Sequence, residues 1–418
     1  MELFRLEHKK LWRKNSTRIC VLLCFFYCVV FGSFLVYQWF VFGSGKDDME
    51  NIGDRNFDGY ENIRDCQAYF HKYGELTDET LQEWVRDYQR LRVALKKEKE
   101  TRGADKIETR KTYRNSGWET VDSMLSTLYP ELEQEEMRYV MIMSCYVEPE
   151  KLTGLYGRRE KALHTFLDVS GQTGEERAYL LQINEKVQEP FSWKWVEGWS
   201  NVLGNTVSGL GIVMALFLTI VLSSLFAGEW HDNTSPLILT TRNGWRKLAA
   251  AKILTGVSFA LELYAIIAVG TVTLQLVYLG TEGWDMPIQT IKMIAIAPMN
   301  MLQAELYEFA FTLLGAVGFA GVVMLISACC KNQVLALLLS LAVVYVPTAI
   351  HNSVPVPLAK AFDLLPLVGS GADIFRTNTF HLFGRYIWSP YLLIWVPFGI
   401  GVLCLMPAVR GWARRMRT

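Results

Sequence analysis

The chain has 418 residues, of which 51% are hydrophobic and 20% are charged, and its formal net charge is zero. This balance argues against a nucleic-acid-binding protein, because no excess of Lys and Arg is present to replace phosphate counterions. The apolar residues are concentrated in long runs between polar segments, a segregation typical of chains that lie partly in lipid.

The eight cysteines are too few and too scattered for a disulfide scaffold. Cys20, Cys24 and Cys28 repeat every four residues along one apolar segment, and no cysteine has zinc-ligand spacing with histidine partners. Cys66 and Cys145 share the largest polar segment. The sequence leaves open whether these two form a disulfide or remain two thiols, and it predicts no metal site.

Six apolar runs are close to the roughly 20 residues that a helix needs to cross a bilayer. They predict an all-α polytopic membrane protein with six transmembrane helices. The third run is long enough to tilt or to contain a break. A cleavable signal peptide is the alternative for the first run, but that run is long and no clear cleavage site follows it. The predicted spans are 19–42, 206–227, 250–279, 309–328, 334–350 and 391–409.

Lys and Arg flank the predicted spans in four clusters, and six spans place all four clusters on one side of the membrane. By the positive-inside rule, both termini are then cytoplasmic in a multi-pass protein of the cell membrane. The clusters are Arg5, Lys9, Lys10, Arg13, Lys14 and Arg18; Arg242, Arg246, Lys247 and Lys252; Lys331; and Arg410, Arg414, Arg415 and Arg417.

Residues 43–205, between the first two spans, form the one polar stretch long enough for a separate domain. The predicted topology makes this domain extracytoplasmic, and its apolar periodicity predicts a mostly α structure with helices over 80–97, 122–132 and 175–187. A structural cap or a partner-docking module is the interpretation we favour for it. The aromatic run at 190–199, just before the second span, is typical of side chains that anchor at the lipid head groups.

The segment 228–249 between the second and third spans contains a predicted short helix. Thr234 or Ser235 can cap it, Pro236 suits its first position, and Asn243 with Gly244 ends it. Its apolar face consists of Leu237, Ile238 and Leu239. An interfacial helix lying on lipid head groups is the alternative.

This segment resembles the corresponding region of ABC transporter permeases of the type-2 exporter family. The residues that follow the family order are Phe226, Glu229, Thr234, Leu237, Leu239, Arg242, Ala251 and Lys252. The chain departs from the family at Asn233, where a glycine is common. The resemblance covers the second to sixth spans and, in outline, the first span and its leader, but it leaves the 43–205 domain unexplained.

The resemblance implies a coupling helix over about 232–246 that docks on a separate ABC ATPase subunit. Glu229, Thr234, Leu237, Ile238, Leu239 and Arg242 would carry the coupling. It also implies an amphipathic elbow helix within residues 1–18, a second permease as a homodimer or heterodimer, and ATP and Mg on the partner ATPase. Residues 250–418 would supply the remaining spans and a basic cytoplasmic tail.

The chain itself lacks the phosphate-binding loop that ATP hydrolysis needs. Residues 43–46 imitate half of it, but Phe40 stands where a Gly is required and Asp47 where a Ser or Thr is required. The sequence also contains no metalloprotease or serine-hydrolase motif. We therefore expect no catalytic residues, no directly bound cofactor and no enzymatic activity in this chain.

Few charged residues occur within the predicted spans. Glu262 lies near the middle of the third span and lines a translocation path or a dimer seam, or else is a protonated side chain bonded to a neighbouring helix. Glu305 and Glu308, at the outer end of the fourth span, are expected to be solvated. The glycines at 315, 318 and 321 predict close helix packing.

Together these features predict an exporter permease whose substrate is an antimicrobial peptide, a lipid or a drug. The alternative of a different class is a membrane sensor or scaffold whose external domain binds a peptide ligand. The two differ in a simple respect, since only the permease requires an ATPase partner.

Overall fold

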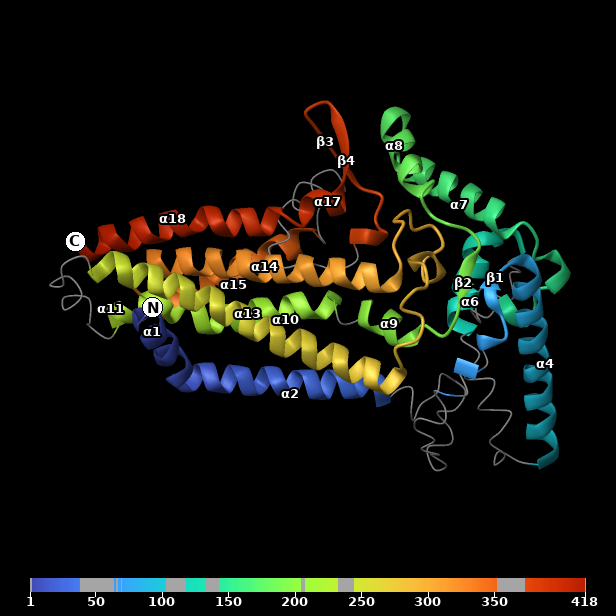
Figure 1. Cartoon of the computed structure of the whole chain (residues 1–418), viewed down its shortest axis with the longest axis horizontal. Coiled ribbons are helices and arrows are strands. Elements are labelled where there is room, and N and C mark those ends of the chain that lie inside the picture. Colours follow the sequence, from blue (N-terminus) through green and yellow to red (C-terminus); the bar gives the residue numbers. More distant parts are fainter. Residues whose placement is uncertain are drawn as a thin grey trace.

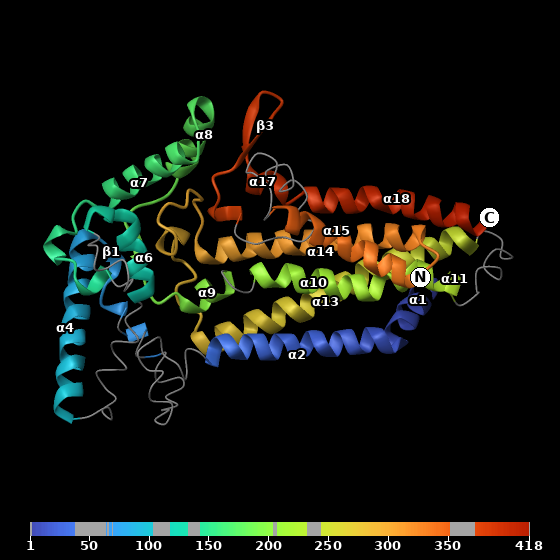
Figure 2. The same cartoon turned by 180° about the vertical axis from the view of Figure 1, so that it is seen from behind.

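The computed structural model describes residues 2–37, 64, 67–68, 70–102, 118–132, 143–203, 207–231, 244–351 and 373–417. Long helices form an elongated bundle, and a second group of helices gathers at one end of it (Figure 1). In both views α18 (Val396–Arg417) and α2 (Asn15–Tyr37) lie at opposite edges of the bundle (Figure 2). Between them lie α10 (Val207–Leu222), α13 (Gly244–Leu279) and α14 (Met301–Cys329).

Four stretches of the described chain are long and apolar enough to cross a membrane: Val213–Trp230, Trp245–Leu279, Met301–Cys329 and Ser389–Arg414. The protein is thus membrane-embedded. The first and fifth predicted spans coincide with the apolar parts of α2 and of α15 (Gln333–His351), which are shorter over the described residues. The count of six spans therefore stays a prediction.

Two predicted spans are divided in the structure. The second consists of α10 and α11 (Ser224–His231), separated at Ser223. The sixth begins with the short helix α17 (Ser389–Leu393), which is followed by α18. The third is one unbroken helix of 36 residues, so it contains no break.

Small residues allow close helix contacts inside the bundle. A Cβ atom added to Gly318 of α14 would lie 2.1 Å from the carbonyl oxygen of Pro397, and one added to Gly401 of α18 would lie 2.3 Å from Gly318. The predicted packing role of the glycines is confirmed at Gly318 and Gly321. On α2, Cys20, Cys24 and Cys28 are buried, and Cys28 lies against Gly270 of α13.

The second group of helices comes from the segment between the first two predicted spans. Its helices are α4 (Asp78–Arg102), α6 (Trp118–Leu128), α7 (Leu155–Val169), α8 (Gly174–Asn184) and α9 (Glu197–Asn201). Strands β1 (Gly74–Leu76) and β2 (Phe191–Trp193) pair antiparallel, with Gly74 opposite Trp193. The three predicted helices are confirmed, although α6 ends before Pro130, which disfavours a helical conformation in the preceding residue.

The hydrophobic core of this group extends beyond the 43–205 boundary. It includes Ile288, Met293 and Ile296 from the connector between α13 and α14, and Trp388 at the end of a hairpin. The hairpin consists of β3 (Thr379–Leu382) and β4 (Arg385–Trp388). We call the described residues of 64–203, 280–300 and 373–388 the distal domain. Three separate chain segments thus build one core at the end of the bundle.

Candidate functional site at the basic end of the helix bundle

The end of the bundle opposite the distal domain carries the predicted basic clusters. Helix α1 (Glu2–Arg13), the start of α13 and the C-terminus lie there (Figure 1). Basic residues of three clusters contact α11: Lys10 and Lys252 bind its Glu229, and Lys331 lies 5.1 Å from the Trp230 ring centroid. The fourth cluster lies on α18, whose Trp412 contacts Phe226 of α11. That this end faces one side of the membrane, the cytoplasmic side, stays a prediction. We call this end the basic end.

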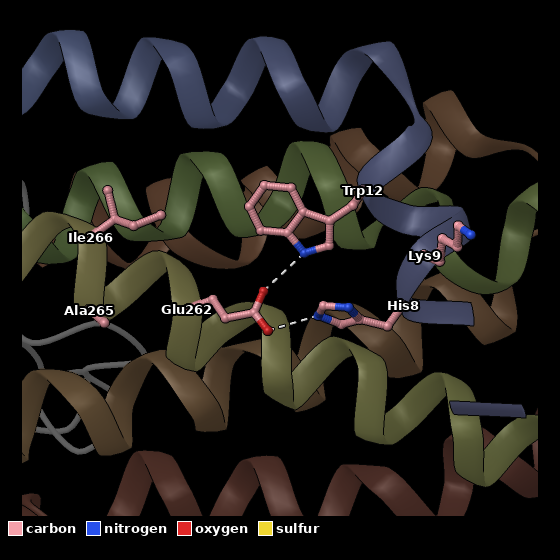
Figure 3. A pocket seen from close by; sticks show the side chains of 6 residues that line it. All are labelled: His8, Lys9, Trp12, Glu262, Ala265 and Ile266. Carbon is pink, nitrogen blue, oxygen red and sulfur yellow. Dashed lines mark hydrogen bonds and ion pairs between the residues drawn. The ribbon is translucent and has the colours of Figure 1, made fainter. Parts of the chain in front are cut away.

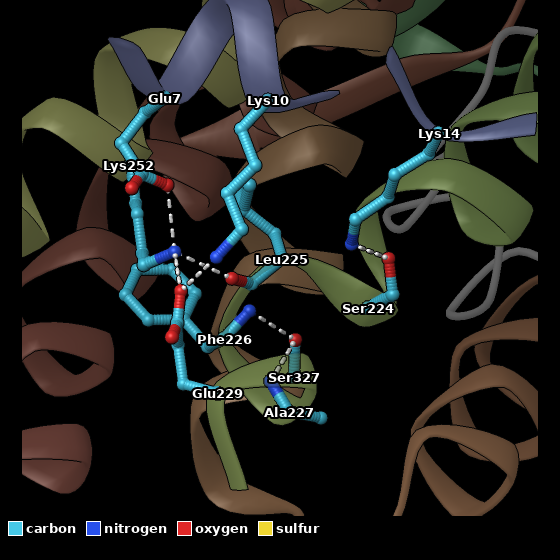
Figure 4. A network of polar contacts seen from close by, with 10 residues as sticks. All are labelled: Glu7, Lys10, Lys14, Ser224, Leu225, Phe226, Ala227, Glu229, Lys252 and Ser327. Atoms are coloured by element: carbon cyan, nitrogen blue, oxygen red, sulfur yellow. Dashed lines mark hydrogen bonds and ion pairs between the residues drawn. The ribbon is translucent and has the colours of Figure 1, made fainter. Parts of the chain in front are cut away.

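A buried ion-pair network joins α1, α11 and α13 at the basic end. The Lys252 ammonium donates to Glu229 Oε1 at 2.8 Å, to Glu7 Oε2 at 2.8 Å and to the Leu225 carbonyl at 3.1 Å (Figure 4). These three acceptors match the three donors of an ammonium group. Lys10 also donates to Glu229 Oε1 at 2.8 Å. The side chains of Lys252 and Glu229 are only 2% and 5% exposed, so pairing is what permits their burial.

A serine on α14 holds the start of α11 in place. Ser327 Oγ accepts hydrogen bonds from the backbone N–H groups of Phe226 at 3.0 Å and Ala227 at 3.1 Å, and it donates to the Ser223 carbonyl at 2.7 Å. The first N–H groups of a helix have no partner within the helix, so Ser327 satisfies groups left free by the break at Ser223. Ser327 could not be predicted from the sequence, because a serine inside an apolar run carries no local sign of such a role.

The structure places only part of the predicted coupling segment. Thr234, Leu237, Ile238, Leu239 and Arg242 lie outside the described residues, so a coupling helix over 232–243 stays a prediction. The predicted extension to 246 is wrong, because Gly244, expected to end that helix, begins α13. The described chain on either side of it is the end of α11 and the start of α13, which the Glu229–Lys252 pair joins. The Glu229 carboxylate belongs to this network, where it binds Lys252 and Lys10. These contacts support a role for Glu229 in positioning the two helices.

Glu262, the other predicted site residue, lies where α1 crosses α13. Its carboxylate accepts hydrogen bonds from His8 Nε2 at 2.8 Å, Ser258 Oγ at 2.8 Å and Trp12 Nε1 at 3.0 Å (Figure 3). The side chain is 34% exposed and lines a surface groove. Two of its donors come from the neighbouring helix α1. The role of Glu262 in a translocation path stays a prediction.

Glu305 and Glu308 differ from expectation. Each is only 1% exposed, so the prediction that they are solvated is wrong. Helix α14 begins at Met301, eight residues before the predicted span, because Asn300 and Gln303 form a capping box. Met301 and Ala304 belong to the distal core, so this first part of α14 is covered by protein.

The aromatic run before the second predicted span is buried rather than lipid-facing. Trp195 is 2% and Trp199 is 8% exposed, so the predicted anchoring at lipid head groups is wrong. Trp195 Nε1 donates to the Leu279 carbonyl at 3.0 Å, and Trp199 Nε1 donates to the Thr281 carbonyl at 2.9 Å. These bonds attach the distal domain to the end of α13.

A buried arginine joins two chain segments within the distal domain. Arg159, 2% exposed, donates to the Met293 carbonyl at 3.0 Å, the Ala295 carbonyl at 3.1 Å, Asn184 Oδ1 at 2.7 Å and Glu189 Oε1 at 3.3 Å. Burial lowers the pKa of its guanidinium, and the Glu189 carboxylate partly offsets that effect. Arg159 therefore ties α7 to the α13–α14 connector.

Within the described residues, no group of three His, Cys, Asp or Glu side chains is placed to hold a metal ion. The polar groups of the basic end are bonded mainly to one another, an arrangement that fixes helices in position. Comparison of the chain with protein-family models, with curated protein sequences and with solved structures finds no match.

Proposed function

We propose that this protein is the permease subunit of an ATP-driven exporter of the ABC type-2 kind. The observation that carries the proposal is the network of Lys252, Glu229 and Glu7. It joins the helix ends that flank residues 232–243 to each other and to α1. In the proposed protein these residues form the coupling helix, so a force that an ATPase applies there acts on three helices together.

Helix α13 would carry this movement across the protein. Its 36 residues span about 54 Å at roughly 1.5 Å per residue. Lys252 lies near one end, and the Leu279 carbonyl at the other end accepts the bond from Trp195. A displacement at the basic end therefore reaches the distal domain through a single helix, and the distal domain would shape or gate the outer mouth.

The number of spans, the topology, the partners and the substrate class in this proposal rest on the sequence and on the family resemblance. Six spans, cytoplasmic termini and an extracytoplasmic distal domain would place the basic end beside the ATPase in the cell membrane. ATP and Mg would bind the ATPase, and a second permease would complete the transporter. The substrate would be an antimicrobial peptide, a lipid or a drug.

Purification of the tagged chain from its native membrane tests the proposal. We expect a stoichiometric ABC ATPase to co-purify, identified by mass spectrometry and by ATP hydrolysis. Replacing Leu237, Ile238 and Leu239 with Asp should abolish this association. The control variant carries Val93→Asp and Val169→Asp, two exposed apolar positions of the distal domain, and should keep the ATPase.

The sensor or scaffold alternative draws on the same rigid connection. The bonds from Trp195 and Trp199 to the end of α13 would transmit a change in the distal domain, on binding a peptide ligand, toward the basic end. This alternative requires no ATPase. An intact chain that purifies alone from its native membrane would overturn the permease proposal and favour the sensor.

A further inference from the structure

The groove beside Glu262 combines a charged group with an apolar surface. It has a volume of about 730 Å³ and lies between α1 and α13. Its lining consists of His8, Lys9, Trp12, Glu262, Ala265 and Ile266 (Figure 3). The groove is shallow and open, so a bound ligand would lie along the surface of the protein.

The polar groups of the groove are held in place before any ligand binds. Both oxygens of the Glu262 carboxylate accept hydrogen bonds, from His8 and Ser258 on one oxygen and from Trp12 on the other. The Trp12 ring packs against Phe259 with centroids 6.1 Å apart. A fixed carboxylate beside an indole ring is the chemistry that recognises an ammonium group, by charge and by cation–π attraction.

The lining changes from charged to apolar along the groove. Lys9 and His8 lie at one end, Glu262 and Trp12 follow, and Ala265 and Ile266 lie one turn farther along α13, in the direction of the distal domain (Figure 3). The Lys9 side chain points away from the carboxylate. A ligand whose chain lies on Ala265 and Ile266 thus meets a negative group first.

We propose that this groove binds an amphiphile whose cationic head is attached directly to its hydrocarbon chain, such as an alkylammonium. The ammonium lies against Glu262 and Trp12, and the chain lies on Ala265 and Ile266. A zwitterionic phospholipid fits less well, because it carries its phosphate between the chain and the ammonium and would bring that phosphate to Glu262. The proposal concerns binding alone and does not rest on the transport function.

Photolabelling of the full chain in phosphatidylcholine nanodiscs tests this site. The probe is an alkyltrimethylammonium with a diazirine on its chain, and the labelled residues are mapped by mass spectrometry. We expect labels on α13 near Ala265 and Ile266. Dodecyltrimethylammonium should compete at least about tenfold better than dodecylphosphocholine or dodecyl sulfate, because only its cation is attached directly to the chain.

Two variants separate binding from folding. Glu262→Gln removes the charge and should weaken labelling about tenfold or more. Ala265→Trp fills the apolar part of the groove, leaves the Glu262 hydrogen bonds in place and should abolish labelling there. Its control is Val269→Trp, one turn farther on the exposed side of α13, which should label like the unaltered chain. Equal labelling of Ala265→Trp and Val269→Trp, or equal competition by all three detergents, would overturn the proposal.

Discussion

The two ends of α13 are held by different kinds of contact. At the basic end, Lys252 is bound by carboxylates from α1 and α11. At the distal end, the carbonyls of Leu279, the last residue of α13, and of Thr281 accept bonds from Trp195 and Trp199. The rings of both tryptophans are buried in an extended apolar core. The same helix is thus fixed by ion pairs at one end and by packing at the other.

The two kinds of contact respond differently to substitution. Loss of one partner from a buried ion pair leaves an uncompensated charge, whereas loss of a side chain from an apolar core leaves a cavity. The basic end is not held by ion pairs alone, because Phe226 and Trp412 are fully buried there. Both ends therefore hold α13 in position, by different means.

The largest expected effect on stability comes from replacing Arg159, a buried cation of the distal domain. Arg159→Met removes the donor that binds the Met293 carbonyl, Asn184 Oδ1 and the Glu189 carboxylate. The Ala295 carbonyl keeps its second bond, from Gln289. Loss of one partner from a buried charged network costs about 3–5 kcal/mol of stability. The free energy of unfolding of the detergent-solubilised chain measures the change. Arg90→Met is the control, because Arg90 is 78% exposed and a surface change costs within about 0.5 kcal/mol.

Limited proteolysis of the same two variants locates the effect. Arg159→Met should expose the α13–α14 connector to cleavage, because Arg159 binds its carbonyls at 293 and 295. Arg90→Met should show the cleavage pattern of the unaltered chain. Identical stability and identical cleavage in both variants would show that packing alone holds the connector against α7.

A smaller loss of stability is expected when either of two lysines that bind the same carboxylate oxygen at the basic end is replaced. Lys252 and Lys10 both donate to Glu229 Oε1 at 2.8 Å, but their side chains are 2% and 46% exposed. Lys252→Met leaves Glu229 and Glu7 facing each other without their shared cation and should cost about 3 kcal/mol. Lys10→Met should cost less than about 1 kcal/mol, as exposed pairs do.

A double-mutant cycle with Glu229→Gln makes the lysine comparison sharper. The coupling energy between residues 252 and 229 should exceed that between residues 10 and 229, and raised salt should weaken only the Lys10 pair, since exposed charges are screened more strongly than buried ones. Equal coupling energies would mean that burial does not control the strength of this network.

Many of the helices could be predicted from the sequence, because apolar periodicity, long apolar runs and flanking basic residues are local signals. The helices around 80–97, 250–279 and 334–350, and the gathering of Lys10, Lys252 and Lys331 at one end, follow from such patterns. The family resemblance includes Glu229 and Lys252 as two residues in a sequence order, and it did not predict that they contact each other. The contact between Glu229 and Lys252 depends on how α11 packs against α13, which no local pattern records.

Two predictions were wrong for one physical reason. Trp195 and Glu305 were assigned to lipid head groups and to solvent from their positions at the ends of apolar runs. The position of a residue within an apolar run indicates how far along the helix it lies. It does not show which other segments of the chain cover the residue there. The distal core brings together residues near 70, 195, 290 and 388, so its extent depends on contacts between distant segments that no local pattern records.

The smallest expected effect is a change in stability with pH that is caused by titration of the Glu189 carboxyl. Burial raises the pKa of this carboxyl above its ordinary value, and the charge of Arg159 only partly offsets that effect. The folded chain therefore favours the protonated form more than the unfolded chain does. The contribution of Glu189 to stability is fully present below the unfolded pKa of about 4.3 and is lost as the pH rises through the raised folded value.

The Glu189→Gln variant keeps a hydrogen-bond acceptor for Arg159, but its side chain cannot ionise. The stability of the variant should therefore lack the decrease that ionisation of Glu189 causes in the unaltered chain. Unfolding measured between about pH 4 and pH 8 should show the unaltered chain losing stability relative to the variant as the pH rises. Glu175→Gln, at an exposed position at the start of α8, is the control and should follow the unaltered chain. A gain of stability in the unaltered chain relative to Glu189→Gln as the pH rises would mean that attraction to Arg159 outweighs burial. Charge pairing would then matter at the packed end of the molecule as it does at the basic end.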